Sequence, residues 1–371
     1  MRLFQERPIV EKYGRAEDFA AEYGIGKGDF ILASRGVYEK YFAPLALEAH
    51  VEYKGKYGKG EPTDGMIDAL LSDFRKTGCE RVIAIGGGAV IDMAKILVLD
   101  GCAGAEQYFR REVPLKKVRR LIAVPTTCGA GSEVSNVSIA EISSMESKLG
   151  LAADEIYADA AVLIPELLTE LPYFYFATSA IDAFIHAIES FVSPRANLYT
   201  EMFSQKAMEM ILAGFGRILS EGAEARQSLL DDFLTASNLA GIAFGNAGTG
   251  MVHAMSYPLS GKYHVAHGEA NYQFLTAVFG FYERECPEGK IGELNRFLAR
   301  CLGCGERDVY SELESLFDRI ISRKRLREYG MVECEILEFA ASVEKSQGRL
   351  LGQSYVRPSA EQMAEVYREL W

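Results

Sequence analysis

The pattern of apolar residues changes near Pro172. Before that residue, short apolar and β-branched runs alternate with amphipathic helical stretches, which is typical of a mostly parallel sheet covered by helices. After it, helical periodicity dominates and no convincing strand is found. At about 150 residues per domain, 371 residues allow two or three domains. We therefore expect an α/β domain over residues 1–172 and an all-helical domain over residues 173–371, with ligands bound in a cleft between them.

Several elements of the first domain can be placed from their end signals. Thr63 is a typical N-cap, and the helix after it presents an apolar face until Gly78 stops it. A second helical stretch follows residue 88. The expected strands are short, apolar and bounded by turn residues, and they cover residues 29–34, 81–85 and 121–124.

Charge and cysteine usage narrow the class of protein. The chain has 40 Lys plus Arg against 52 Asp plus Glu, a net charge of −12, and no basic run that suits nucleic acid. Apolar stretches such as Leu171–Ile181 are too short to span a membrane, and the first residues lack a signal-peptide core. The seven cysteines are irregularly spaced, so we expect reduced thiols in a cytoplasmic protein. We interpret Cys301 and Cys304 as packing thiols rather than zinc ligands.

The first candidate site is the glycine run Gly86, Gly87 and Gly88, between an expected strand and an expected helix. Three glycines let backbone N–H groups approach a diphosphate, and the helix N-terminus adds partial positive charge. The GxGxxG spacing of the Rossmann fingerprint is missing, and a tight turn can use glycines only for positive φ. Both interpretations stay open from this motif alone.

The second candidate is the loop from Pro125 to Ser135, which follows the next expected strand. Its small hydroxyl and glycine residues face the same crevice of an open α/β sheet, where they can bind ribose or phosphate. A simple Gly/Ser/Thr turn is the alternative. Two such loops on consecutive strand ends favour a nucleotide cofactor.

The third candidate lies in the helical half. Asp182 and His186 are four residues apart on one otherwise apolar helical face, and four of the five histidines fall between residues 186 and 267. Each histidine alone is more often structural. Together with His253 and His267, however, the pair supplies one carboxylate and three imidazoles, a set suited to Fe(II) or Zn(II) with an open position for substrate.

These motifs, in this order, resemble the iron-containing (group III) alcohol dehydrogenases almost from end to end. The similar segments are Gly86–Lys95, Pro125–Glu133, Ala180–Glu189 and His253–Gly268. The resemblance implies a dehydroquinate synthase-like architecture, with a dinucleotide-binding domain followed by a helical metal-binding domain, and a homodimer. It implies NAD, with NADP as the alternative, and one divalent metal as cofactors, and a small alcohol or aldehyde as substrate.

The resemblance also implies roles for single residues. Asp182, His186, His253 and His267 would bind the metal. The pyrophosphate would meet the glycine turn and its neighbour, and the ribose and nicotinamide would meet the next loop and one lysine. These cofactor residues are Gly86, Gly87, Gly88, Ala89, Thr126, Thr127 and Lys148.

The chain departs from the family pattern at several positions. Many members have a histidine thought to relay protons four residues after the third metal ligand, where this chain has Tyr257. The acidic residue that usually meets the adenosine ribose is replaced by Ser34, which would tolerate a 2′-phosphate. Lys262 and Glu269 stand where relatives have small or apolar residues, and Lys262 is a candidate cation for a substrate carboxylate.

Three segments look most like family members that oxidise 4-hydroxybutyrate to succinate semialdehyde, namely 134–142, 179–194 and 240–248. The activity implied is reversible and metal-dependent, with hydride transfer to nicotinamide. A close rival is another alcohol or polyol dehydrogenase acting on 1,3-propanediol, butanol or glycerol. Rivals from other classes are a metal-dependent lyase resembling dehydroquinate synthase and a non-catalytic binding module.

Overall fold

The computed structural model describes residues 3–101, 103–145 and 147–371. They form two compact units. Residues 6–171 make up the sheet unit, and residues 3–5 join Pro172–Trp371 in the helical unit. The N-terminal residues therefore belong with the helices, which a single division of the chain at residue 172 does not describe.

The sheet unit contains six parallel strands in the order β1-β8-β5-β4-β2-β3. The four inner strands are apolar and buried, as expected for a parallel sheet covered on both faces. The two edge strands of the sheet are β1 and β3. The strands are β1 (Ile9–Lys12), β2 (Asp29–Ala33), β3 (His50–Tyr53), β4 (Arg81–Gly86), β5 (Arg120–Pro125) and β8 (Ala160–Leu163).

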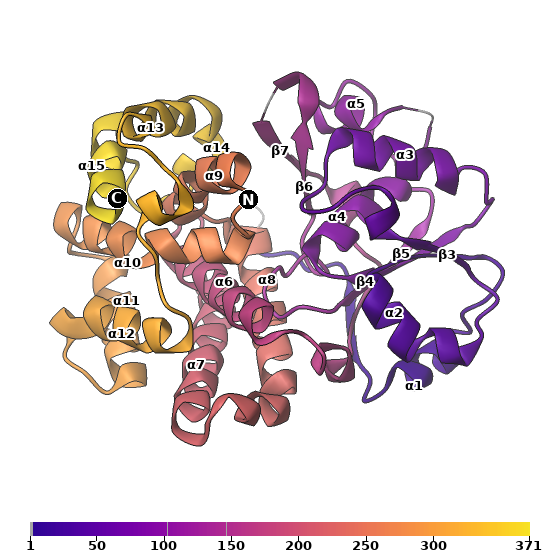
Figure 1. Ribbon diagram of the computed structural model, residues 1–371, viewed down its shortest axis with the longest axis horizontal. Coiled ribbons are helices and arrows are strands. Elements are labelled where there is room, and N and C mark those ends of the chain that lie inside the picture. Colours follow the sequence, from indigo (N-terminus) through magenta and orange to yellow (C-terminus); the bar gives the residue numbers. More distant parts are fainter. Residues whose placement is uncertain (1–2, 102, 146) are drawn as a thin grey trace. The chain divides into compact units, whose positions relative to one another are not determined.

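Helices cover this sheet on both faces (Figure 1). On one face, α3 (Asp64–Phe74), α4 (Gly88–Leu97) and α5 (Ala105–Phe109) pack on the apolar residues of β2, β4 and β5. The opposite face carries α1 (Ala16–Glu22) and α2 (Arg35–Tyr41). The Thr63 side chain accepts a hydrogen bond from the Met66 N–H at 3.2 Å, which confirms the predicted N-cap of α3.

Three strands and one hairpin were not predicted from the sequence patterns. The strands β1, β3 and β8 have only four residues each, too few for a period to show. An antiparallel hairpin of β6 (Val137–Ile142) and β7 (Ser147–Ala152) packs beside α5. The sequence patterns predicted neither strand of this hairpin.

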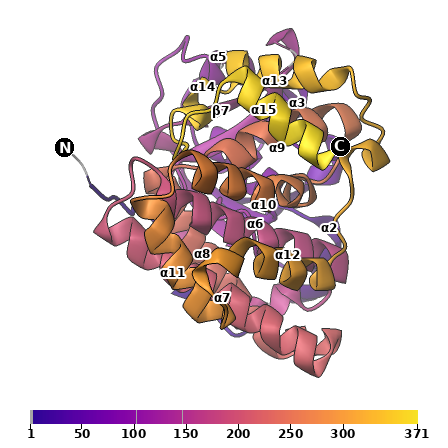
Figure 2. The same ribbon diagram turned by 90° about the vertical axis from the view of Figure 1, so that its left-hand side faces the viewer.

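The helical unit is built around α6 (Tyr173–Val192), which is almost entirely buried and packs on α7, α8 and α10. Figure 2 looks onto this unit, with α13 and α15 above α10 and with α11 and α12 below it. In the part of the chain after residue 171, all of it described, no strand is present, as predicted. The other helices are α7 (Leu198–Glu221), α8 (Leu230–Ala247), α9 (Met251–Tyr263), α10 (His267–Glu285), α11 (Lys290–Leu302), α12 (Val309–Ile320), α13 (Glu335–Ser346), α14 (Gly348–Leu351) and α15 (Ala360–Leu370).

Within the described residues, no helix combines the length and the apolar character that crossing a membrane requires.

Candidate metal centre and nucleotide loops

Three helices of the helical unit bring four candidate ligands together. Asp182 and His186 lie one turn apart on α6, His253 lies on α9, and His267 is the first residue of α10. One ligand atom from each side chain lies within 4.8 Å of all the others. The His186 ring stacks on His253 at 4.7 Å between centroids. The predicted metal set is therefore one cluster, although the four residues span 86 positions of the chain.

The short turn between α9 and α10 places two of these ligands. His264 ends α9 in the left-handed conformation, with φ of 54°, and α10 begins three residues later. At Gly268, a Cβ atom would lie 2.3 Å from the carbonyl oxygen of Thr178 and 3.2 Å from Cβ of Asp182. Glycine at this position therefore lets α10 touch the backbone of α6 directly beside the ligand cluster.

Asp182 is held as a carboxylate by its neighbours. Its Oδ1 accepts a hydrogen bond of 2.7 Å from the Asn271 amide, and Nε2 of His253 and Nε2 of His267 each lie 3.9 Å from one of its oxygens. Burial raises the pKa of Asp182, but the three histidines and Asn271 outweigh burial and bring its pKa below the usual value. A charged oxygen ligand is thus available at neutral pH.

His253 has one ring nitrogen that is hydrogen-bonded and one that has no hydrogen-bond partner among the described residues. Nδ1 lies 2.5 Å from Oε2 of Glu189, whereas Nε2 is buried and has no hydrogen-bond partner among the described residues. Burial lowers the pKa of His253, but the carboxylates of Glu189 and Asp182 outweigh it and raise the pKa above the usual value. A buried nitrogen without a partner, facing one carboxylate and two imidazoles, fits a metal ligand.

The donor set determines which ions fit. One carboxylate oxygen and three imidazole nitrogens suit Fe(II) or Zn(II) and leave a position for substrate. His267 is the most accessible ligand, with 34% of its side chain exposed, while the other three are buried. The open side of the cluster is therefore next to His267.

Of the two predicted catalytic residues, one lies at the cluster. The ring of Tyr257 lies one turn beyond His253, 6.2 Å from the ring of His267. Lys262 instead forms an ion pair with Glu335 on α13, and its ammonium lies 5.9 Å from the Phe339 ring. The positive charge that we assigned to substrate binding is thus offset by a buried carboxylate. Glu269 accepts a hydrogen bond from the hydroxyl of Tyr329.

In the sheet unit, the glycine turn follows β4, and Gly87 caps the N-terminus of α4. None of its three glycines has a positive φ, so turn conformation does not explain them. Space does. A Cβ on Gly86 would lie 2.4 Å from the Val90 side chain, and one on Gly88 would lie 3.0 Å from Cβ of Ala130. Ala89 is the second residue of α4.

The loop after β5 packs against this turn. The Thr126 N–H donates to the Gly86 carbonyl at 3.1 Å, and a Cβ on Gly87 would lie 3.3 Å from the Thr127 side chain. The two loops predicted to share a crevice are therefore in contact at the carboxyl edge of the sheet. This arrangement offers backbone groups and a helix N-terminus, which suits a pyrophosphate.

The other predicted cofactor residues are dispersed within the sheet unit. Ser34 follows β2 directly and begins α2, and its neighbour Arg35 lies 4.4 Å above the Tyr53 ring. Lys148 lies on β7 and forms an ion pair with Glu61.

Sequence reasoning gave no role to a buried ion pair behind the glycine turn. Lys95 is fully buried on α4, and its ammonium lies 3.5 Å from Asp92 and 3.2 Å from the Ser135 hydroxyl. Burial lowers the pKa of Lys95. Asp92 also accepts from the Ile139 N–H, so the pair ties α4 to β6.

Two polar partners of the metal cluster were missed as well. Glu189 follows His186 by three residues, and Asn271 follows His267 by four. Both spacings place a polar residue on the same helical face as a ligand. That periodicity, continued past each histidine, could have found them.

A parallel-sheet unit with backbone-lined loops, followed by a helical unit with an internal Asp/His₃ cluster, defines a two-domain metalloenzyme. The comparisons identify the family. Residues 11–165 match the model of the iron-containing alcohol dehydrogenases, and residues 176–371 match the C-terminal model of the Fe-containing alcohol dehydrogenase family. The chain belongs to the iron-containing alcohol dehydrogenase family and is an oxidoreductase acting on CH–OH groups.

Two named relatives cover much or all of the chain. The 4-hydroxybutyrate dehydrogenase of Clostridium kluyveri is 48% identical over 371 residues, which is 100% of both chains. The long-chain-alcohol dehydrogenase 1 of Geobacillus thermodenitrificans is 30% identical over 78% of this chain and 72% of its own.

Solved structures share the fold. An archaeal alcohol dehydrogenase from a Red Sea brine pool aligns over 100% of both chains with a TM-score of 0.86 at 20% identity. The sulfoacetaldehyde reductase of Bifidobacterium kashiwanohense, solved with NAD⁺, aligns over 99% of this chain and 98% of its own with a TM-score of 0.85 at 22% identity. The predicted fold class is confirmed.

Proposed function

We propose that the chain is a metal-dependent, NAD(P)-linked dehydrogenase that reversibly oxidises 4-hydroxybutyrate to succinate semialdehyde. The observation that carries the proposal is the identity of 48% along the whole length to a 4-hydroxybutyrate dehydrogenase, combined with the Asp/His₃ cluster. Relatives named for other alcohols are less similar and match only part of the chain.

In this proposal, Asp182, His186, His253 and His267 hold Fe(II) or Zn(II). Such an ion supplies Lewis acidity, which lowers the pKa of a substrate hydroxyl and polarises an aldehyde carbonyl. The four residues orient the site, and burial of three of them excludes water from its inner side. In this proposal Tyr257, whose ring lies 6.2 Å from that of His267, exchanges a proton with solvent, less readily than a histidine at pH 7.

The glycine turn and the loop after β5 bind the dinucleotide in this proposal. Backbone N–H groups at the start of α4 meet the pyrophosphate, and Thr126, Thr127 and Lys148 meet the ribose and nicotinamide side. Bound NAD would supply the acceptor for the hydride. Ser34 adds no negative charge near the adenosine ribose, which favours tolerance of NADP.

An activity panel tests the substrate. Initial rates are measured with 4-hydroxybutyrate, 1,3-propanediol, glycerol, butanol and ethanol, each with NAD and NADP. We expect kcat/KM for 4-hydroxybutyrate to exceed that for butanol by far more than the ~10-fold that a missing methylene can give. Comparable values would leave a general alcohol dehydrogenase, and the absence of net reduced cofactor would favour the lyase.

Lys262 is the candidate residue for binding the substrate carboxylate. Lys262 can serve only if it exchanges Glu335 for the substrate. In that case Lys262→Met raises KM for 4-hydroxybutyrate and leaves KM for butanol unchanged. An equal KM for 4-hydroxybutyrate in both proteins would remove Lys262 from the site.

Chelation tests the metal. We expect activity to disappear when the metal content falls below one ion per ten chains and to return with Fe(II) or Zn(II). A fully active chelated enzyme would exclude the metal-dependent mechanism.

We also propose a cytoplasmic homodimer that joins edge to edge at β1. On this edge strand, Ile9 is 64% and Val10 is 42% exposed, and an exposed apolar edge is a ready template for pairing. The six described cysteines are free, which suits a reducing cytoplasm. Light scattering on the wild type and on Val10→Lys tests the dimer, since the variant should be monomeric.

A further inference from the structure

Glu189 is a buried acidic residue to which neither the sequence motifs nor the proposed mechanism gives a role. It lies on α6, three residues after His186 and seven after Asp182, so it continues the helical face that carries these ligands. Only 2% of the residue is exposed. A carboxylate buried to this extent needs hydrogen-bond donors for both of its oxygens.

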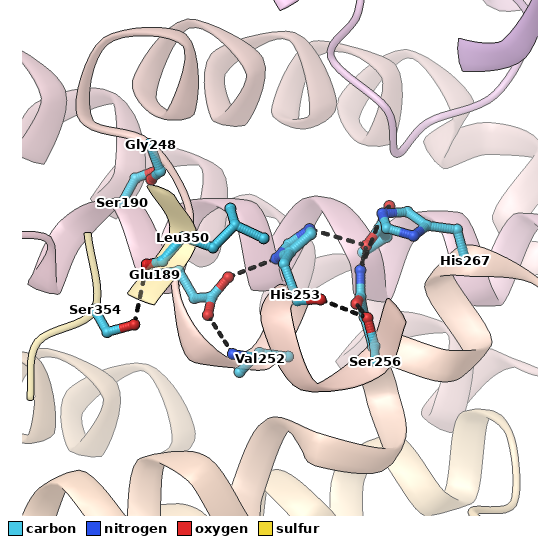
Figure 3. A network of polar contacts seen from close by, with 11 residues as sticks. Glu189, Ser190, Gly248, Val252, His253, Ser256, His267, Leu350 and Ser354 are labelled. Carbon is cyan, nitrogen blue, oxygen red and sulfur yellow. Dashed lines mark hydrogen bonds and ion pairs between the residues drawn. The ribbon is translucent and has the colours of Figure 1, made fainter. Parts of the chain in front are cut away.

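Both donors come from the start of α9. Oε2 of Glu189 lies 2.5 Å from Nδ1 of His253, and Oε1 accepts a hydrogen bond of 2.7 Å from the Val252 N–H. Figure 3 shows the His253 ring between Glu189 on one side and His267 on the other. Gly250 lies beside this carboxylate, and a Cβ there would lie 3.1 Å from Cα of Ser354 and 3.4 Å from Oε1 of Glu189.

These contacts define the protonation of the imidazole. An ionised carboxylate only accepts hydrogen bonds, so Nδ1 of His253 carries a proton. In a neutral imidazole, Nε2 then has its lone pair free. That nitrogen is the buried atom that faces the ligand cluster and has no hydrogen-bond partner among the described residues.

We propose that Glu189 is the positioning residue of the metal centre: it holds His253 in the tautomer and orientation in which Nε2 can bind the ion. This inference rests on the proposed metal site. Residues that accept a hydrogen bond from the distal nitrogen of a ligating histidine orient the ring and increase its basicity as a ligand.

The amide of glutamine cannot replace the carboxylate. If its oxygen accepts from the Val252 N–H, its NH₂ group faces Nδ1 of His253 and makes that nitrogen an acceptor. The proton then moves to Nε2 and blocks it as a ligand. If the amide is reversed, its NH₂ group opposes the Val252 N–H, donor against donor. Glu189→Gln therefore tests charge and tautomer with almost no change in volume.

The first experiment measures zinc affinity by competition with a chromophoric chelator. We expect Glu189→Gln to weaken binding by about 10- to 100-fold. Glu335→Gln is the matched control, since Glu335 is also a nearly buried glutamate of the helical unit but accepts from Lys262, Tyr263 and Val332 rather than from a metal ligand. It should bind zinc as the wild type does.

The second experiment needs no metal. The spectrum is recorded on apo protein labelled with ¹⁵N-histidine, at a pH high enough to keep the His253 ring neutral, and is assigned with His253→Gln. The wild type should then show the Nδ1–H tautomer of His253. In Glu189→Gln, the Nε2–H tautomer should appear. A purely structural role of Glu189 would change stability but not this tautomer.

The outcomes separate the two proposals. If wild type binds no zinc, the metal function fails, while the tautomer still decides the role of Glu189. Wild-type affinity together with an unchanged tautomer in Glu189→Gln overturns the inference. If Glu189→Gln does not fold, Glu189→Asp is used instead, because it keeps the negative charge but moves it away from His253 by one methylene. Wild-type zinc affinity and a wild-type tautomer in Glu189→Asp would also overturn the inference.

Discussion

In the sheet unit, the candidate nucleotide loops make room by omitting side chains, since a Cβ on Gly86 or Gly88 would meet Val90 or Ala130. In the helical unit, four side chains converge, and Glu189 and Asn271 hold them from behind. The first kind of site depends on backbone shape and is damaged by adding atoms. The second depends on individual functional groups and is damaged by removing them. Each kind of damage should therefore leave the other site intact.

The largest effect is expected from Asp182→Ala. The helical core can close around the missing side chain, but the charged ligand is lost, so kcat should fall by at least about 10²-fold. Metal analysis should show substoichiometric loading, whereas NAD affinity and the circular dichroism spectrum should match the wild type. Lost NAD binding would show that the two sites are not independent.

Gly268→Ala comes next, because it tests a close approach inside the helical unit. The new Cβ meets the Thr178 carbonyl oxygen, which cannot rotate away, and the overpacking should cost about 1–3 kcal/mol of unfolding free energy. Gly261→Ala is the control, since nothing lies within 4 Å of its new Cβ in α9, and it should stabilise by about 0.5–1 kcal/mol. Denaturant unfolding measures the free energy of unfolding of both variants. Equal values for the two would disprove the close contact between Gly268 and the Thr178 carbonyl.

In the sheet unit, Gly88→Ala should raise KM for NAD by about tenfold. Its Cβ would lie 3.0 Å from Ala130 and 3.4 Å from the Ser132 hydroxyl, so the two loops must separate slightly. Metal content should stay at the wild-type level. Gly28→Ala is the control. Gly28 precedes β2, at the end of the sheet away from the glycine turn, and no atom lies within 4 Å of its new Cβ. A normal KM for NAD would return the glycines to a purely structural role.

Ser34→Asp adds a charge to the same backbone-lined region. A carboxylate beside the 2′ position repels a phosphate, so the ratio of kcat/KM for NAD to that for NADP should rise by about tenfold. An unchanged ratio would show that Ser34 does not line the adenosine site.

The smallest effect concerns pH and a cluster outside both sites. Burial raises the pKa of Glu335, but hydrogen bonds from Lys262, Tyr263 and the Val332 N–H outweigh it, so its pKa lies below the usual value. The group therefore stabilises the fold above its unfolded pKa, and this stability is lost as pH falls through the folded pKa. Glu335→Gln should lower Tm by about 2–4 °C at pH 7. The difference from wild type should shrink below pH ~4.3, as thermal melts at several pH values will show.

The long, periodic features of this molecule were readable from sequence, and the short or polar ones were not. Thr63 and the helix after it carried a cap and a complete apolar face. The strand β1 has four residues, and the hairpin of β6 and β7 is held by a buried Lys95, which a sequence pattern interprets as exposed. The Asp182 and His186 pair was visible as a helical spacing. Glu189 and Asn271 follow His186 and His267 at helical spacing, so they could have been found, but which ligand each one contacts emerges only when α9 and α10 are placed against α6.

The ligand cluster draws on α6 and on the hairpin of α9 and α10, which join it from positions up to 85 residues apart. Only the native chain assembles such a cluster, so an ion that binds there binds the folded state and not the unfolded one. By mass action, free metal at 100 times its dissociation constant adds about 2.7 kcal/mol to the free energy of unfolding. If the proposed metal site is correct, loss of the ion would therefore lower the stability of the folded chain as well as its activity.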